Sequence, residues 1–215
     1  MDKNDLIIEC RAEGPFMKNG YVVGTAGDRK AVYIDPGDEA GQMISFIEKN
    51  DLSLQAVLAT HGHMDHICGI GTVLAKWKVP VYLHREDEFI YSGLGDQSRY
   101  FGMNYSPAPP VDHYLEDGQV LSFGELEFKV YHTPGHSPGG VCLEKGDNLF
   151  TGDLIFAGSV GRTDLPGGDM ETLMDSIRRR IASFPEDTIL WPGHGPRTTV
   201  GNELRSNPFR NSFLP

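Results

Sequence analysis

The sequence predicts an α/β protein built as a four-layer αββα sandwich, in which two sheets face each other and helices cover their outer sides. Two observations lead to this fold class. In each half of the chain, strand-like runs precede a segment with helical periodicity, and another strand-like run follows it. The chain has 215 residues, enough for one well-buried core but short for two full-sized ones. We therefore expect a single domain over residues 1–215.

The first half contains short runs that are rich in β-branched or aromatic residues and end at turn-forming residues. These predicted strands lie at 6–11, 21–26, 31–37, 54–60 and 79–84. Apolar residues recur at i, i+3, i+4 and i+7 over 40–47, which predicts a helix. A second helix is predicted over 67–77, and Pro80 would end it.

The second half repeats this order of elements. Predicted strands lie at 119–123, 126–133, 140–145, 148–153 and 188–195. Apolar residues at helical spacing over 170–181 predict a helix, with Asp169 as its N-cap. Residues 91–110 show no period and are rich in Gly, Pro and aromatic residues, so we expect a long surface loop there. It would be either a lid over a site or a plain connection.

Composition and charge argue against several classes of partner. The formal net charge is −11 and the isoelectric point is near 5.1, so a nucleic-acid backbone would repel the chain. No apolar run reaches about 18 residues, and we expect no membrane span. The N-terminus lacks the pattern of a secretory signal, and Cys10, Cys68 and Cys142 are widely spaced. Both features predict a cytoplasmic protein without a disulfide framework. No feature predicts an oligomeric state.

The segment THGHMDHICG concentrates metal-binding side chains directly after the predicted strand at 54–60. It contains His61, His63, Asp65 and His66. Ligand groups commonly lie at the carboxyl ends of strands in α/β proteins. The alternative is a helix-start loop in which Asp65 caps the helix and the histidines are solvated. Imidazole and carboxylate groups at this spacing favour a metal site.

Three further segments place one ligand-type side chain after a strand-like run and a glycine-containing turn. They are HTPGHSPGG with His136, LFTGDLIF with Asp153, and LWPGHGP with His194. Each of these residues alone is typical of a turn or a helix cap. Together with the first segment they would supply enough ligands for two divalent metal ions. Zinc is the expected metal, and the same ligands suit iron or manganese.

This order of motifs resembles the metallo-β-lactamase superfamily, over nearly the whole chain. The resemblance implies the metallo-β-lactamase fold, and it also implies which ion each side chain binds. For the first ion it implies His61, His63 and His136. For the second ion it implies Asp65, His66 and His194, with Asp153 bridging both.

The resemblance narrows further. No cysteine lies at a motif position, as one does in the best-known zinc β-lactamases, and Asp153 fills the bridging position as in glyoxalase II. The segments at 158–169 and 192–209 look like the short, single-domain glyoxalase II-like (hydroxyacylglutathione hydrolase-like) proteins of bacteria. The sequence ends at residue 215, so we expect it to lack the C-terminal helical region that supplies much of the glutathione site in the long glyoxalase II enzymes.

The mechanism implied is attack of a metal-bridging hydroxide on a carbonyl carbon. Two ions sharing a water lower its pKa from about 15.7 to about 7. Asp65 would be catalytic as well as a ligand, because it would orient that hydroxide or briefly accept a proton. A thiolate has a solution pKa near 8.5 and leaves without a proton donor, which favours a small thioester such as S-lactoylglutathione over a lactam. Arg162 and Arg197 would pair with substrate carboxylates or tie loops to carbonyl groups.

Other activities stay open at this point. A persulfide dioxygenase would hold one iron on His61, His136 and Asp153, and its family shares the GRTD segment found here. A lactone or ester hydrolase of the same fold is a further alternative. Electron-transfer members carry Glu where this chain has His63, and a nuclease of this fold would need a basic surface. Neither of these two classes fits the sequence.

Overall fold

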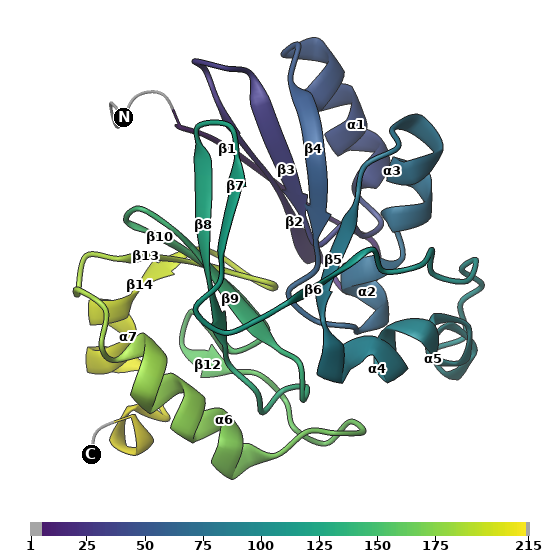
Figure 1. Cartoon of the computed structure of the whole chain (residues 1–215). Coiled ribbons are helices and arrows are strands. Elements are labelled where there is room, and N and C mark those ends of the chain that lie inside the picture. Colours follow the sequence, from purple (N-terminus) through teal and green to yellow (C-terminus); the bar gives the residue numbers. More distant parts are fainter. Residues whose placement is uncertain (1–5, 214–215) are drawn as a thin grey trace.

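The computed structural model describes residues 6–213, and two six-stranded sheets face each other in it (Figure 1). The first sheet contains, in spatial order, β1 (Leu6–Glu13), β2 (Lys18–Thr25), β3 (Lys30–Ile34), β4 (Ser53–Leu58), β5 (Val81–His84) and β6 (His113–Leu115). The second contains β14 (Thr198–Thr199), β13 (Ile189–Pro192), β10 (Asn148–Gly152), β9 (Val141–Lys145), β8 (Leu126–His132) and β7 (Val120–Phe123). A small hairpin of β11 (Ile155–Phe156) and β12 (Ser159–Val160) forms a separate two-stranded sheet that packs beside β13.

Helices cover the outer faces of both sheets. The first sheet carries α1 (Ala40–Lys49), α2 (Met64–Ile67) and α3 (Ile70–Lys76), with α4 (Glu88–Ser92) and α5 (Leu94–Tyr100) at its end (Figure 1). The second sheet carries α6 (Met170–Ser176), which continues into a π-helical turn (Ile177–Ile181), and α7 (Val200–Ser206). Short 3-10 turns lie at Arg85–Asp87 and Arg210–Ser212. The αββα sandwich is thus confirmed. No helix within residues 6–213 is long and apolar enough to cross a membrane.

Three buried clusters of apolar side chains fill the spaces between the four layers. Along β3, Ala31 and Tyr33 pack under the helices of the first sheet, whereas Val32 and Ile34 pack between the two sheets. The third cluster lies between the second sheet and α6 and α7. Because each central strand is buried on both faces, its sequence reads as a continuous apolar run instead of an alternating one.

Parallel strand directions bring the ends of several strands to the same edge of the sandwich. In the first sheet, β3, β4 and β5 are parallel neighbours. In the second, β10 is parallel to β13, and both β8 and β10 are antiparallel to β9. The segments that follow β4, β8, β10 and β13 therefore leave from one edge, and this edge holds the candidate site.

The prediction of a surface loop at 91–110 was wrong for the first half of that segment, which contains the end of α4 and the whole of α5. These helices have five and seven residues, too few for a helical period to be visible, and Gly93 separates them. The predicted helix over 67–77 is also divided. At Gly69 the chain passes so close to the loop after β3 that a Cβ would lie 2.2 Å from the carbonyl oxygen of Gly37. The short elements β6, β14 and α7 were not predicted.

Because the layer between the sheets is closely packed, removal of an aromatic ring from it should lower the stability of the fold substantially. Phe128 on β8 is fully buried in this layer, so Phe128→Ala should lower the free energy of unfolding by about 3–5 kcal/mol. Urea denaturation followed by circular dichroism measures the change. Val120→Ala, on the exposed face of the adjacent strand β7, is the control and should change stability by less than about 0.5 kcal/mol. Equal effects of the two substitutions would contradict this account of the core.

Candidate metal centre

The predicted ligand side chains come from loops at one edge of the two sheets. His61 and His63 follow β4, and Asp65 and His66 lie in the short helix α2. The other three follow strands of the second sheet: His136 after β8, Asp153 after β10 and His194 after β13. Residues that are 70 or more positions apart in the sequence thus lie side by side.

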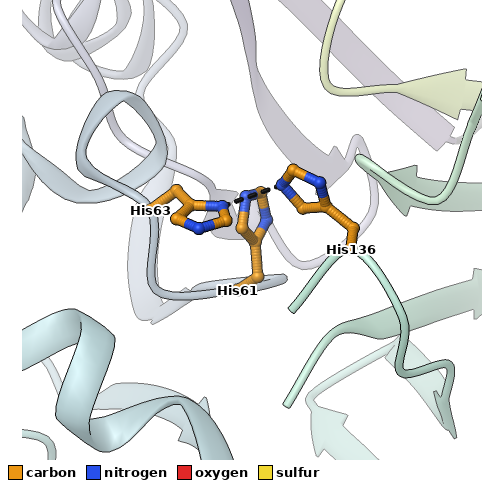
Figure 2. A group of neighbouring side chains, drawn as sticks. All are labelled: His61, His63 and His136. Carbon is orange, nitrogen blue, oxygen red and sulfur yellow. Dashed lines mark hydrogen bonds between the residues drawn. The ribbon is translucent and has the colours of Figure 1, made fainter. Parts of the chain in front are cut away.

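The ligand atoms of these residues form three overlapping groups, and the atoms of each group lie within 4.8 Å of one another. The groups are His61, His63 and His136; His61, His66 and Asp153; and Asp65, His66 and His194. In the first group, Nδ1 of His63 lies 2.8 Å from Nε2 of His136, and the ring of His61 lies beside them (Figure 2).

Asp153 lies between the groups. Its Oδ1 atom is 3.3 Å from Nε2 of His66, and its Oδ2 atom is 3.6 Å from Nε2 of His136. His194 Nε2 lies 3.4 Å from the same Oδ2 atom. On the other side, His194 Nε2 is 3.2 Å from Oδ2 of Asp65. The carboxylate of Asp153 therefore lies close to histidines from all three groups.

The chemistry of these side chains fits divalent cations. Among the residues that the structure describes, three buried atoms of the candidate ligands make no hydrogen bond: Nε2 of His61, Nε2 of His66 and Oδ1 of Asp153, the last two of which lie 3.3 Å apart as an ion pair. Burial of a polar atom without a partner costs free energy, and a bound cation removes that cost. Imidazole nitrogens and carboxylate oxygens are the ligands that zinc, iron and manganese accept.

Hydrogen bonds to the second ring nitrogen orient most of the histidines. Nδ1 of His66 lies 2.8 Å from Oδ2 of Asp35, and Nδ1 of His136 lies 2.7 Å from the carbonyl oxygen of Arg162. Nδ1 of His194 likewise lies 3.1 Å from the carbonyl oxygen of Phe16. An acceptor at Nδ1 holds a proton there and turns Nε2 toward the other candidate ligands, so a metal ion would bind at Nε2 in place of a second proton.

Two buried carboxylates that support the ligand loops were missed in the sequence analysis. Asp35 directly follows β3 with a φ of +52°, and its side chain accepts hydrogen bonds from the backbone N–H (2.6 Å) and the hydroxyl (2.7 Å) of Thr60. These bonds join the ends of β3 and β4 next to His66. The only signal was the run YIDPG at a strand end, which indicates a turn.

The second supporting carboxylate, Asp87, joins the ligand loops of the two sheets. Its Oδ2 atom accepts from the N–H of Gly62 (2.7 Å) and from the hydroxyl of Ser137 (2.8 Å). Its Oδ1 atom accepts from the N–H of Gly139 (2.5 Å). Gly62 lies between His61 and His63, whereas Ser137 follows His136 directly. Asp87 thus fixes the separation of the two loops that form the first group, and no local pattern in the sequence marks it.

Burial and neighbouring charges separate the pKa values within the site. Burial and the nearby His66 and His136 lower the pKa of His61 well below its usual value. Burial and His136 lower the pKa of His63 to about 3. Both side chains are therefore neutral at pH 7, which is the form that binds a metal. Burial raises the pKa of Asp153, but His66 and His194 outweigh it and hold that carboxyl ionised.

A cavity of about 380 Å³ opens over these residues. Six of its thirteen lining residues are apolar: Phe16, Met64, Phe101, Phe156, Val160 and Leu165. Arg162 also lines it, and its guanidinium donates two hydrogen bonds, of 2.6 and 2.7 Å, to the carboxylate of Asp164. Arg197 instead lies over the ring of Trp191, 5.3 Å from the centroid.

Comparisons of the sequence and of the structure with known proteins point to the same family. Residues 14–194 match the Metallo-beta-lactamase superfamily. The hydroxyacylglutathione hydrolase GloC of Haemophilus influenzae is 39% identical over 194 residues, which cover 86% of this chain and 89% of that protein. The crystal structure of BLEG-1 B3 metallo-beta-lactamase superposes with a TM-score of 0.88 at 40% identity, covering 95% of this chain and 99% of the other. That of TTHA1623 in a di-iron-bound form gives 0.85 at 41%, covering 94% and 99%.

The contacts of Asp87 predict that it controls metal binding without touching the metal. In Asp87→Asn, an amide NH2 replaces one acceptor oxygen, so at least one buried donor loses its partner. We expect metal affinity to fall about 10- to 100-fold, measured as metal-to-protein ratio after dialysis against buffers of fixed free zinc. Glu88→Gln, an exposed carboxylate directly after Asp87, should leave the ratio unchanged. If both variants retain full metal content at every zinc level, Asp87 does not position the first group.

Proposed function

The chain belongs to the metallo-beta-lactamase superfamily, and from this premise we propose that it is a metal-dependent hydrolase of thioesters, with S-lactoylglutathione as the first substrate to test. The observation that carries the proposal is the convergence of imidazole and carboxylate ligand atoms, several without partners, under an open cavity. The similarity to a hydroxyacylglutathione hydrolase supports the substrate class.

We assign the ligands to two ions as the family resemblance implies. The first ion takes His61, His63 and His136. The second takes Asp65, His66 and His194, with Asp153 shared by both. Two divalent ions bound there would supply an activated water and polarise a substrate carbonyl. We propose zinc as the metal, with iron as the alternative that the di-iron form of TTHA1623 supports.

Asp65 is the residue we assign to proton handling. Its side chain lines the cavity, and His194 Nε2 lies 3.2 Å from its Oδ2 atom. Burial raises its pKa, but His66 and His194 have the larger combined effect and lower it. The carboxylate is therefore ionised at pH 7 and would accept a hydrogen bond, or a proton, from the attacking water.

The wall of the cavity favours a thioester over an amide. An amide nitrogen must be protonated as it leaves, whereas a thiol with a pKa near 8.5 leaves as the thiolate. Apart from the candidate ligands and Arg162, the residues that line this cavity are Gln97 and apolar side chains. None of these is a proton donor near pH 7, and Arg162 is held by Asp164.

The first test is hydrolysis of S-lactoylglutathione and of a small neutral thioester, S-acetyl-N-acetylcysteamine, by protein loaded with zinc, iron or manganese. We expect release of free thiol that chelator abolishes and added metal restores. Failure of every metal-loaded form to hydrolyse these two compounds and any longer neutral thioester would overturn the proposal. Oxygen uptake with glutathione persulfide by the iron form would then identify the dioxygenase alternative, with one iron on His61, His136 and Asp153.

The shared ligand gives a second prediction. Asp153→Ala should remain folded but bind less metal, and turnover should fall by more than about 100-fold, beyond the loss seen for residues that only support ligands. Metal content and thiol release measured on the same sample separate the two effects. Asp187→Ala, at an exposed position in the turn before β13, is the control. Full activity of Asp153→Ala would sink the assignment of this residue.

A further inference from the structure

A second cavity, of about 540 Å³, adjoins the candidate metal centre. It lies against α4 and α5 and the loop at 164–166, and we call it the α4–α5 pocket. Four of its lining residues also line the cavity over the metal centre: His63, Gln97, Phe101 and Leu165. The two spaces are therefore continuous, and the α4–α5 pocket begins at a candidate ligand.

Three aromatic side chains that are exposed to solvent line this pocket: Phe89, Tyr100 and Phe101. Phe89 is 57% exposed and Tyr100 is 82% exposed, although aromatic rings gain free energy when they are buried. The ring of Phe101 contacts that of Tyr100, with centroids 5.1 Å apart, and that of Phe16 at 5.4 Å. Phe16 lines the metal-centre cavity. A series of contacting rings thus leads from one cavity into the other.

The pocket is attached firmly to the ligand loop. The side-chain amide of Gln97 on α5 accepts a hydrogen bond from the N–H of Met64 (3.0 Å) and donates one to the carbonyl oxygen of Ile90 (2.7 Å). Met64 lies between His63 and Asp65. Both helices that form the pocket are therefore held at a fixed position relative to the candidate ligands, so a substrate arm in the pocket would place its reactive group over the metal centre.

The charges in the two cavities do not suit an anionic arm. Arg162 is the one Lys or Arg side chain among the residues that line them, and Asp164 occupies its guanidinium with two hydrogen bonds. The α4–α5 pocket itself is lined by the carboxylates Asp96 and Asp164. A glutathione arm carries two carboxylates, and neither would meet a free cation here.

We propose that the α4–α5 pocket binds an uncharged, apolar arm of the thioester substrate, such as an aliphatic chain or an aromatic ring. This inference rests on the proposed function and specifies its substrate class. The arm belongs to the acyl group or to the thiol, and these two sources share the same chemistry. A fully buried methylene contributes up to about fourfold in binding, so a half-buried one contributes about twofold.

The test is a pair of substrate series. The first varies the acyl group on N-acetylcysteamine from acetyl to hexanoyl and phenylacetyl, and the second keeps acetyl and replaces N-acetylcysteamine by benzyl mercaptan. We expect kcat/KM to rise about tenfold or more along one series, and the series that responds identifies the arm. S-lactoylglutathione should be a poorer substrate than the best apolar thioester.

Variants connect this preference to the pocket. In the double variant Phe89→Ala/Tyr100→Ala the preference should shrink to less than about threefold, because kcat/KM for the apolar thioesters falls toward that for the acetyl thioester. Tyr100→Phe keeps the ring and should keep the preference, as should Phe209→Ala, an exposed ring that lines neither cavity. Hydrolysis of all thioesters at equal efficiency, or a preference that survives the double variant, would overturn the pocket assignment while leaving the hydrolase intact. Absence of all thioester hydrolysis would overturn both.

Discussion

The constraint on which the rest of this structure depends is the burial of polar ligand atoms that make no hydrogen bond to any residue within 6–213. Imidazole and carboxylate groups at the meeting point of the sheets, His66 and Asp153 among them, give up hydration without forming protein hydrogen bonds at the atoms that face inward. Such an arrangement survives only if the surrounding fold prevents the side chains from rotating away to find water or one another. The neighbouring structure meets this need from both sheets.

Three kinds of support are visible around the ligands. Backbone carbonyl oxygens and the carboxylate of Asp35 accept hydrogen bonds from the Nδ1 atoms of the histidines. The carboxylate of Asp87 joins the ligand loop of the first sheet to that of the second. Glycine allows the closest approach: a Cβ at Gly193 would lie 2.1 Å from Oδ1 of Asp153 and 2.6 Å from Cε1 of His66. The glycines in the motif turns are therefore a packing requirement of the site as well as turn formers.

Features that depend on a local pattern of residues, such as the order of strands and helices, could be predicted from the sequence. The αββα architecture followed from alternating strand-like and helix-like runs, and α6 begins at Asp169, whose side chain accepts from the N–H of Thr172 as an N-cap. Asp35 and Asp87 could not be found this way, because what distinguishes them is contact with Thr60 and Ser137, residues 25 and 50 positions away. Helices α4 and α5 are too short for their periodicity to show.

The segment predicted as a loop is also where substrate selection should reside. Relatives of nearly equal similarity carry different names, a hydroxyacylglutathione hydrolase at 39% identity and a B3 metallo-beta-lactamase at 40%, so overall similarity does not determine the substrate. The candidate ligands serve any reaction that needs an activated water. Discrimination must then come from the surfaces that contact the rest of the substrate, and here α4 and α5 form such a surface. If the α4–α5 pocket binds substrate as proposed, its exposed aromatic rings would select by apolar contact, which the metal ligands do not offer.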